Sequence, residues 1–350
     1  MHNQPIKLIV ILSVMLMLGV FNPAKHSAYA QGDAVLTYLS WHPSGQFLAG
    51  VEFNFNNGVQ NVLILDRQYQ VLSTIPVSSE KLLGRIVWNS NGTQLAFGTH
   101  EPYDNVEIFV FDVDTTVTPI NVQLRRTLQQ ATTEVPIITW SPIDKDIIAA
   151  TFWNDVRFWD ISAGTLSSAM SDYEVDIKSG ITAEIVWHPS GQWIATHNRF
   201  DTLTITDVSV NPPQNVVTWT IPDRDPLGLE WSPTGDQLAL TDGSFSENRH
   251  NVFIFSWVGT TQTLVLERTL TNATRVQWLQ WRGDHLLTMS EDRAIDIWNT
   301  TNWQLETIIE RDSFPPELQW NGLSLSPDGT ELAYISPEGN QIRPIGQARP

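Results

Sequence analysis

Apolar and polar residues alternate along many short stretches of this chain, with a period of two. In VEIFVF (106–111), Val106, Ile108 and Val110 fall on one side of an extended chain and the residues between them on the other. NVFIFSW (251–257) alternates in the same way. Glycine, proline, asparagine or aspartate separates these stretches, which favours β-strands joined by turns. Beyond residue 31, no stretch is free of these breakers and of β-branched runs for long enough to predict a helix.

One motif recurs along the chain and organises these strands. WHPSGQ stands at 41–46 and again at 187–192, and related stretches occur between and after them. The copies begin at Trp41, Trp88, Trp140, Trp187, Trp231, Trp281 and Leu325. In most of them, a triplet such as Pro-Ser-Gly forms a tight turn between two apolar strands, because proline presets φ and glycine accepts the turn conformation.

The repeat predicts an all-β fold, a seven-bladed β-propeller of four-stranded antiparallel blades. The copies start 44 to 52 residues apart, close to the ~40–45 residues of one propeller blade. A single propeller domain is predicted over 31–350. Its blades are expected to begin near residues 34, 83, 136, 182, 227, 275 and 319. A pair of β-sandwiches is the alternative, but it predicts no sevenfold motif.

Closure of the ring is the open question of this architecture. Blade seven supplies three strands before the chain stops at Pro350. A fourth strand would have to come from residues near 31–36, a short segment just before blade one. Otherwise blade seven has three strands, or the ring closes loosely.

Several third strands end in an aromatic residue followed by Asp or Asn. Examples are Phe111-Asp112, Trp159-Asp160 and Trp298-Asn299, the last within SEDRAIDIWN (290–299). These units resemble the WD-repeat β-propeller family, and the resemblance covers essentially all of 34–345. The chain departs from the family in one respect. The Gly-His pair that opens a WD-repeat blade is missing from every unit, so Asp292 and Trp298 match two members of the family's hydrogen-bonded set, and its histidine has no match.

The first thirty residues have the pattern of a secretory signal peptide. A short start with one lysine precedes an apolar run, Leu8–Phe21, and a polar stretch ending in Ala28-Tyr29-Ala30. Cleavage is predicted before Gln31, with 1–30 removed and the protein secreted or periplasmic. The alternative is a retained membrane anchor, although the apolar run is shorter than the roughly 20 residues that span a bilayer. After cleavage, no membrane insertion is expected.

Composition and motifs narrow the range of possible functions and binding sites. The chain of 350 residues has no cysteine, which excludes disulfides and thiolate metal sites. Its formal net charge of −18 argues against nucleic acid and anionic membrane surfaces, because phosphate binding requires positive charge. No G-x-S-x-G, P-loop or dinucleotide glycine pattern occurs. We therefore predict no catalytic residues, no cofactor and no metal site. His42 and His188 share one slot of the repeat, which favours a role in the turn.

The binding rim implied by the resemblance consists of loops between blades and loops joining second and third strands. Aromatic, arginine and acidic residues in these loops suit a protein interface. The candidate binding residues are Tyr103, Asp172, Tyr173, Glu174, Asp176, Arg199, Phe200, Asp223, Asp225 and Phe245. The candidate structural residues are Trp41, Trp88, Trp140, Trp159, Trp187, Trp231, Trp281, Asp292 and Trp298.

The predicted function is that of a non-catalytic scaffold whose partner is an unidentified protein or peptide. The alternative is a propeller hydrolase acting on a glycan or lactone, with carboxylates in the central funnel; a close pair of acids with one raised pKa would favour it. A structural cation in the axial channel is a third hypothesis. We expect a monomer, because a closed ring has little edge to pair with a neighbour.

Overall fold

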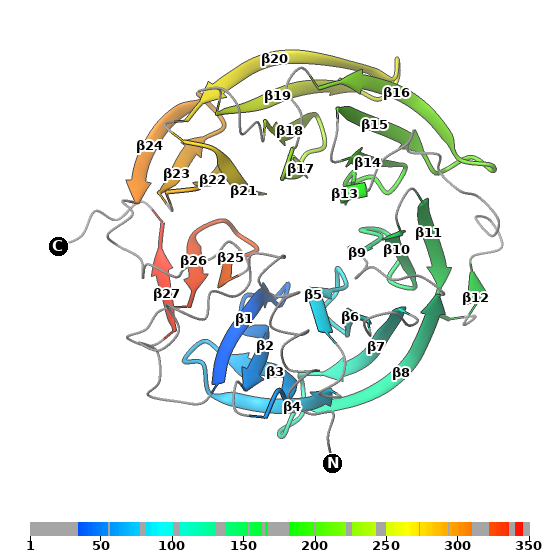
Figure 1. Cartoon of the computed structure of the whole chain (residues 1–350), viewed down its shortest axis with the longest axis vertical. Helices are drawn as coiled ribbons and strands as arrows, with labels where there is room; N and C mark the ends of the chain where they lie inside the picture. Colours follow the sequence, from blue (N-terminus) through cyan, green and yellow to red (C-terminus); the bar gives the residue numbers. More distant parts are fainter. Residues whose placement is uncertain are drawn as a thin grey trace, which may run out of the picture.

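A closed ring of β-sheets surrounds a central axis in the computed structural model of the chain (Figure 1). The structure describes residues 34–54, 57–77, 82–100, 106–130, 137–152, 155–162, 165–166, 182–198, 201–221, 226–242, 250–272, 274–292, 294–309, 322–335 and 340–345. Six sheets have four strands, and the last has three within these residues. The predicted fold class, a seven-bladed β-propeller of antiparallel blades, is confirmed.

Consecutive strands form each blade. Blade one contains β1 (Ala34–Trp41), β2 (Phe47–Asn54), β3 (Gln60–Asp66) and β4 (Val71–Val77). Blade two contains β5 (Leu82–Trp88), β6 (Gln94–His100), β7 (Val106–Asp114) and β8 (Asn121–Gln130). Blade three contains β9 (Ile138–Trp140), β10 (Ile147–Phe152), β11 (Asp155–Asp160) and β12 (Thr165–Leu166). Blade four contains β13 (Thr182–Trp187), β14 (Trp193–Asn198), β15 (Thr202–Asp207) and β16 (Gln214–Thr220).

The remaining blades follow the same order. Blade five contains β17 (Leu229–Trp231), β18 (Gln237–Thr241), β19 (Asn251–Val258) and β20 (Thr263–Thr271). Blade six contains β21 (Val276–Arg282), β22 (His285–Ser290), β23 (Ile295–Asn299) and β24 (Gln304–Ile309). Blade seven contains β25 (Leu323–Leu325), β26 (Glu331–Tyr334) and β27 (Gln341–Pro344). In every blade the first strand lies nearest the axis and the last lies at the periphery (Figure 1).

Burial along the strands follows their place between neighbouring sheets. In β14, the second strand of blade four, every residue is buried, because other blades cover both of its faces. In β7, buried Val106, Ile108 and Val110 alternate with half-buried residues, as the sequence pattern predicts. The outer strand β20 is mostly exposed. The hydrophobic core therefore runs around the ring between the blades.

The aspartate or asparagine that ends several third strands closes the following turn. Asp160 accepts hydrogen bonds from the backbone N–H of Ser162 at 2.9 Å and from its hydroxyl at 2.6 Å. Asp207 and Asn299 make the same pair of bonds to Ser209 and Thr301. Such side-chain bonds hold a turn by replacing missing backbone partners. The aromatic-Asp pair thus has a local structural explanation.

A β-bulge recurs between the third and fourth strands. In blade two, Val110 pairs with Arg126 and Phe111 with Leu124, so Arg125 is the extra residue. The same shift occurs in blades one, four, five and six. A bulge bends the strand and redirects one side chain, and here it turns Arg125 toward blade three.

Side chains close the ring between blades seven and one, a junction that we call the seam. Residues from Ala34 onward form the inner strand of blade one and are not a fourth strand of blade seven; residues 31–33 lie outside the described part. Arg67 of blade one binds both carboxylate oxygens of Glu331, at 2.6 and 2.7 Å. The Tyr69 hydroxyl donates to the carbonyl of Gln341 at 2.9 Å. Within the described residues, blade seven therefore has three strands, and polar side chains join it to blade one.

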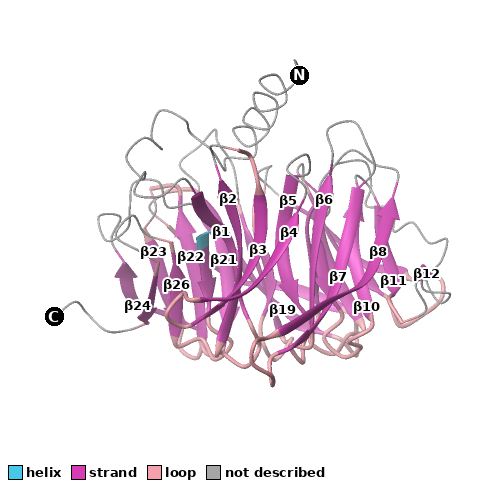
Figure 2. Cartoon of the chain, turned by 90° about the horizontal axis from the view of Figure 1, so that it is seen from below, coloured by secondary structure: helices cyan, strands magenta, loops and turns pink. Residues whose placement is uncertain are grey.

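The two faces of the ring differ in their connections (Figure 2). Turns that join first to second strands, such as 42–46, and third to fourth strands, such as 67–70, lie on one face, which we call the turn face. Because neighbouring strands are antiparallel, the other connections leave from the opposite face, which we call the loop face.

Candidate functional site

The tryptophans that begin the repeats connect neighbouring blades. Three of their indole N–H groups donate to a backbone carbonyl in the first strand of the preceding blade. The bonds run from Trp41 to Ser324 (2.9 Å), from Trp88 to Ser40 (3.3 Å) and from Trp140 to Val87 (3.2 Å). Trp231 and Trp281 are also buried, at 4% and 2% exposure, whereas Trp187 is only partly buried.

His42 and His188 are fully engaged in turn and inter-blade contacts. The Nδ1 atom of His42 accepts the backbone N–H of Ser44 at 3.0 Å, and Nε2 lies 3.0 Å from the carbonyl of Gly92 in the next blade. His188 makes the same contacts to Ser190 and to Gly235 in blade five. A carbonyl can only accept, so the proton of each neutral imidazole resides on Nε2. Burial lowers the pKa of both histidines, although the bond to the glycine carbonyl partly raises it.

An ion pair joins the inner strands of two blades that are not neighbours. Arg85 on β5 of blade two reaches Glu184 on β13 of blade four, with Nη1 and Oε1 2.7 Å apart. The Glu184 side chain is 7% exposed and that of Arg85 36%. Burial raises the pKa of Glu184, and Arg85 opposes this effect. The negative charge of Glu230 on β17 adds to the rise, so charged residues from the inner strands of blades two, four and five influence one another.

A second ion pair links the inner strands of blades five and six. Arg282 Nη1 lies 2.8 Å from Glu230 Oε1, and both side chains are partly exposed. A carboxyl with a raised pKa beside a second carboxylate is the arrangement that a general acid–base pair uses. Here, however, each carboxylate is already bound by an arginine. The two ion pairs therefore connect the inner strands of different blades.

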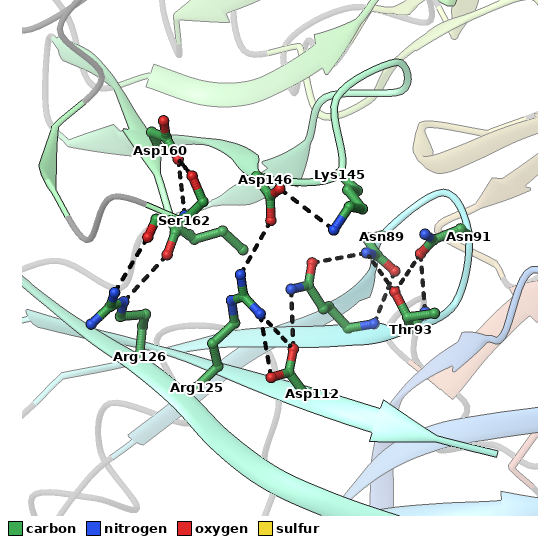
Figure 3. Close-up of polar contacts among 12 residues, drawn as sticks. Asn89, Asn91, Thr93, Asp112, Arg125, Arg126, Lys145, Asp146, Asp160 and Ser162 are labelled. Carbon is green, nitrogen blue, oxygen red and sulfur yellow. Dashed lines mark hydrogen bonds and ion pairs between the residues drawn. The ribbon is translucent and has the colours of Figure 1, made fainter. Parts of the chain in front are cut away.

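A polar cluster joins blades two and three on the turn face (Figure 3). Arg125 Nη1 lies 3.3 Å from Asp112 Oδ1 on its own blade, and Arg125 Nη2 lies 3.6 Å from Asp146 Oδ1 in blade three. Arg126 donates to the carbonyls of Ile161 and Ser162, at 3.3 and 3.4 Å. Two consecutive arginines therefore bridge to the same neighbour, because the bulge places both on that side.

Comparison with known proteins agrees with this ring. THO complex subunit 3 of Arabidopsis thaliana is 24% identical over 302 residues, which cover 75% of this chain and 88% of that protein. The WD repeat-containing protein AAC3 of Dictyostelium discoideum is 21% identical over 277 residues; the match covers 75% of this chain and only 55% of that protein. No protein-family profile matches the chain.

Solved structures show the same architecture. The β-propeller domain of Myceliophteria thermophila Cps50 (Swd1) superposes with a TM-score of 0.67 at 15% identity, covering 89% of this chain and 96% of that one. A chain of the Mitotic Checkpoint Complex superposes with a TM-score of 0.65 at 16% identity, covering 89% and 91%. The chain is a divergent WD-repeat β-propeller.

The WD-repeat pattern is modified in blade six. The indole N–H of Trp298 lies 3.4 Å from the Thr288 hydroxyl, which in turn donates to the side-chain oxygen of Asn272 at 3.3 Å. Asn272 stands shortly before β21, near where a WD-repeat blade carries its histidine. Asp292 accepts the backbone N–H of Ala294 at 3.1 Å in the turn after β22. The Asn272 side chain thus provides the polar group that a histidine provides in a WD-repeat blade.

The candidate binding residues of this WD-repeat propeller remain predictions. All ten, Tyr103, Asp172, Tyr173, Glu174, Asp176, Arg199, Phe200, Asp223, Asp225 and Phe245, lie outside the described residues. Among the candidate structural residues, Trp159 is 5% exposed, and Trp298 is partly buried against the core of blades five and six. The axial ion pairs and the Arg125 cluster were not predicted, because no local pattern indicates which distant strands meet.

Two observations concern the described part of the WD-repeat propeller. No group of three or more His, Asp or Glu side chains within it is arranged to hold a metal ion. None of its segments forms an apolar helix that could cross a bilayer.

Proposed function

We propose that this WD-repeat propeller is a non-catalytic scaffold that binds a protein or peptide on its loop face. The observation that carries the proposal is the ring of seven β-sheets in a chain similar to a protein named as a complex subunit, THO complex subunit 3. A propeller suits this role because a framework of packed sheets can carry binding loops that need no core of their own.

The ion pairs of the inner strands support a scaffold over a hydrolase. Acid–base catalysis requires a carboxyl that can exchange a proton with substrate. Glu184 is 7% exposed and bound to Arg85, and Glu230 is bound to Arg282. These bonds join the inner strands of different blades, so the charged groups strengthen the ring that presents the loops.

Crosslinking of the full chain to extract of its source cells tests the scaffold. The crosslinked peptides would be identified by mass spectrometry. A saturable protein partner crosslinked to residues 170–180, 221–228 or 242–250 is the expected result. Specific crosslinks confined to the turn face would contradict the proposed face, and saturable turnover of a glycan or lactone would contradict the absence of catalysis.

We also propose that the protein acts outside the cytoplasm. Support comes from the N-terminal pattern, in which one lysine, the apolar run Leu8–Phe21 and Ala28-Tyr29-Ala30 follow in order. N-terminal sequencing of the protein from fractionated source cells should find Gln31 first, in the extracytoplasmic fraction. An intact Met1 in the cytoplasmic fraction would overturn this location.

A further inference from the structure

Three stretches of the sequence match the acceptor pattern for N-linked glycosylation, Asn-x-Ser/Thr. They are NGT (91–93), NAT (272–274) and NTT (299–301). The modification attaches a bulky, hydrated group to the side-chain nitrogen, so it requires an asparagine whose nitrogen reaches solvent in the folded protein. The surroundings of each asparagine therefore decide which of the three can carry a sugar.

The second and third of these asparagines use their side-chain nitrogens within the fold. Asn272 is 6% exposed; its Oδ1 accepts the Thr288 hydroxyl at 3.3 Å, and its Nδ2 donates to the carbonyl of His250 at 3.3 Å. Asn299 is half-buried, and its Nδ2 donates to Glu306 Oε1 at 2.6 Å. A sugar on either nitrogen would crowd these partners, and at Asn272 it would have to fit into a buried site.

Asn91 differs from both, because it is exposed in the turn between β5 and β6 (Figure 3). Its Oδ1 accepts the backbone N–H of Thr93 at 3.1 Å and the Thr93 hydroxyl at 2.7 Å. Both bonds use the oxygen, and Nδ2 makes no hydrogen bond within the described residues. The buried Asn89 binds the start of β6 instead, through the backbone N–H and the side chain of Gln94. A sugar on Asn91 Nδ2 would therefore break none of these bonds.

The equivalent turn of blade seven shows that the fold does not require an amide at this position. Asp328 stands there, also exposed, and its Oδ1 accepts the backbone N–H and the hydroxyl of Thr330 at 3.1 and 2.8 Å. A carboxylate oxygen thus makes the same two bonds that the Asn91 oxygen makes in blade two. The nitrogen of Asn91 is the part of the side chain that the turn does not use.

We propose that Asn91 carries an N-linked oligosaccharide and that Asn272 and Asn299 do not. In the transfer, Asn91 Nδ2 forms a bond to the anomeric carbon of a lipid-linked oligosaccharide. The bond from that carbon to the lipid diphosphate breaks, the lipid diphosphate leaves, and Nδ2 loses one proton. The proposal rests on the extracytoplasmic location proposed above. The sugar would cover the turn face at blade two and leave the loop face open to the protein partner.

Mass spectrometry of the protein purified from its source cells tests the modification. Trypsin separates the three acceptor patterns into the peptides 86–125, 269–275 and 294–311. An oligosaccharide that a glycosidase specific for Asn-linked sugars removes is expected on 86–125 only. A protein that begins at Gln31 and has no sugar on 86–125 would overturn this proposal alone, whereas a cytoplasmic protein that begins at Met1 would overturn the location as well. Sugar on either of the other two peptides would overturn the assignment to one asparagine.

Matched variants expressed in the source cells locate the acceptor. Asn91→Gln should abolish the modification, whereas Thr93→Ser, which keeps the acceptor pattern, should retain it. Asp328→Asn creates Asn-Gly-Thr in the equivalent exposed turn of blade seven and should add a second oligosaccharide, on the peptide 312–343. Sugar that persists in Asn91→Gln would overturn the site. An unmodified Asp328→Asn variant would contradict the inference that this exposed turn is what makes Asn91 an acceptor.

Discussion

At the scale of single residues, the position in the repeat determines what a tryptophan does. Trp231 is 4% exposed and has its ring 4.9 Å from that of His188 and 6.0 Å from that of Trp257. Trp187 occupies the same position in blade four, but it is only partly buried and lies 5.8 Å from Phe158. The same motif therefore contributes different amounts of buried apolar surface in different blades.

Substitution of these two tryptophans should destabilise the protein to different extents. Trp231→Ala should lower the free energy of unfolding by about 3–5 kcal/mol, because it leaves a large cavity among aromatic rings. Trp187→Ala should cost less, since part of its ring already faces solvent. Urea unfolding followed by circular dichroism would measure both. A loss for Trp187→Ala equal to that for Trp231→Ala would contradict the assigned difference in packing.

The two turn histidines should make stability depend on pH. Their pKa values are lowered in the folded state, mainly by burial, so the fold favours the neutral imidazole. Their contribution is therefore fully present above the unfolded pKa of about 6.5 and is lost as the pH falls through the folded pKa. Urea unfolding at several pH values should show a smaller acid-side loss in His42→Gln/His188→Gln than in wild type. An unchanged pH slope would exclude these histidines as its source.

At the scale of elements, each tight turn also forms part of the junction between blades. Gly92 ends the turn of blade two with φ +73°, and its carbonyl accepts the proton of His42 from blade one. Gly45 has a similar φ of +69°, but no heavy atom lies within 4 Å of where its Cβ would be. Positive φ explains glycine at both positions, and close approach adds a second requirement at Gly92.

Alanine substitutions at Gly45 and Gly92 should distinguish the cost of backbone strain from the cost of steric crowding. Gly45→Ala should cost about 1–2 kcal/mol, the strain of a left-handed conformation. Gly92→Ala should cost about 1–3 kcal/mol more, because its Cβ would stand 2.1 Å from His42 Nε2 and displace the imidazole. Urea unfolding of both variants measures the difference. When Gly92→Ala is combined with His42→Ala, the extra cost of crowding should disappear. If the double variant kept the whole of this extra cost, crowding against His42 would not be its cause.

At the scale of the whole molecule, side chains from distant parts of the sequence hold the ring together. Arg67 and Glu331 join the two ends of the propeller at the seam. Arg85 and Glu184 join the inner strands of blades two and four, and the Glu184 side chain is only 7% exposed. Removing one member of such a pair leaves the other charge without its partner, which costs more than replacing both.

A double-mutant cycle tests the ion pair between Arg85 and Glu184. Arg85→Met should lower the free energy of unfolding by about 1–3 kcal/mol, less than the loss for a fully buried pair because the Arg85 side chain is 36% exposed. Arg85→Met with Glu184→Leu should recover part of that loss, since no unpaired charge remains. Urea unfolding at neutral pH measures the cycle. Additive losses from the two single substitutions would show that the pair is not energetically coupled.

The sequence alone predicts much of this architecture, because blades are built from local patterns. Alternation in VEIFVF predicts β7, and the recurring turns predict the number of sheets and their order. The same repeat predicts where loops separate the strands. The candidate binding residues on those loops remain predictions, because they lie outside the described part of the chain.

Only the tertiary structure shows which residues meet across blades. Arg85 and Glu184, Arg67 and Glu331, and Arg125 and Asp146 belong to different repeats, and no spacing within one repeat indicates their pairing. The exposure of Ile143 likewise depends on how blades three and four pack. Local hydrogen bonding and alternation act over a few residues and can be recognised in sequence. The axial ion pairs, the seam and the Arg125 cluster arise only when the ring closes and brings distant side chains together.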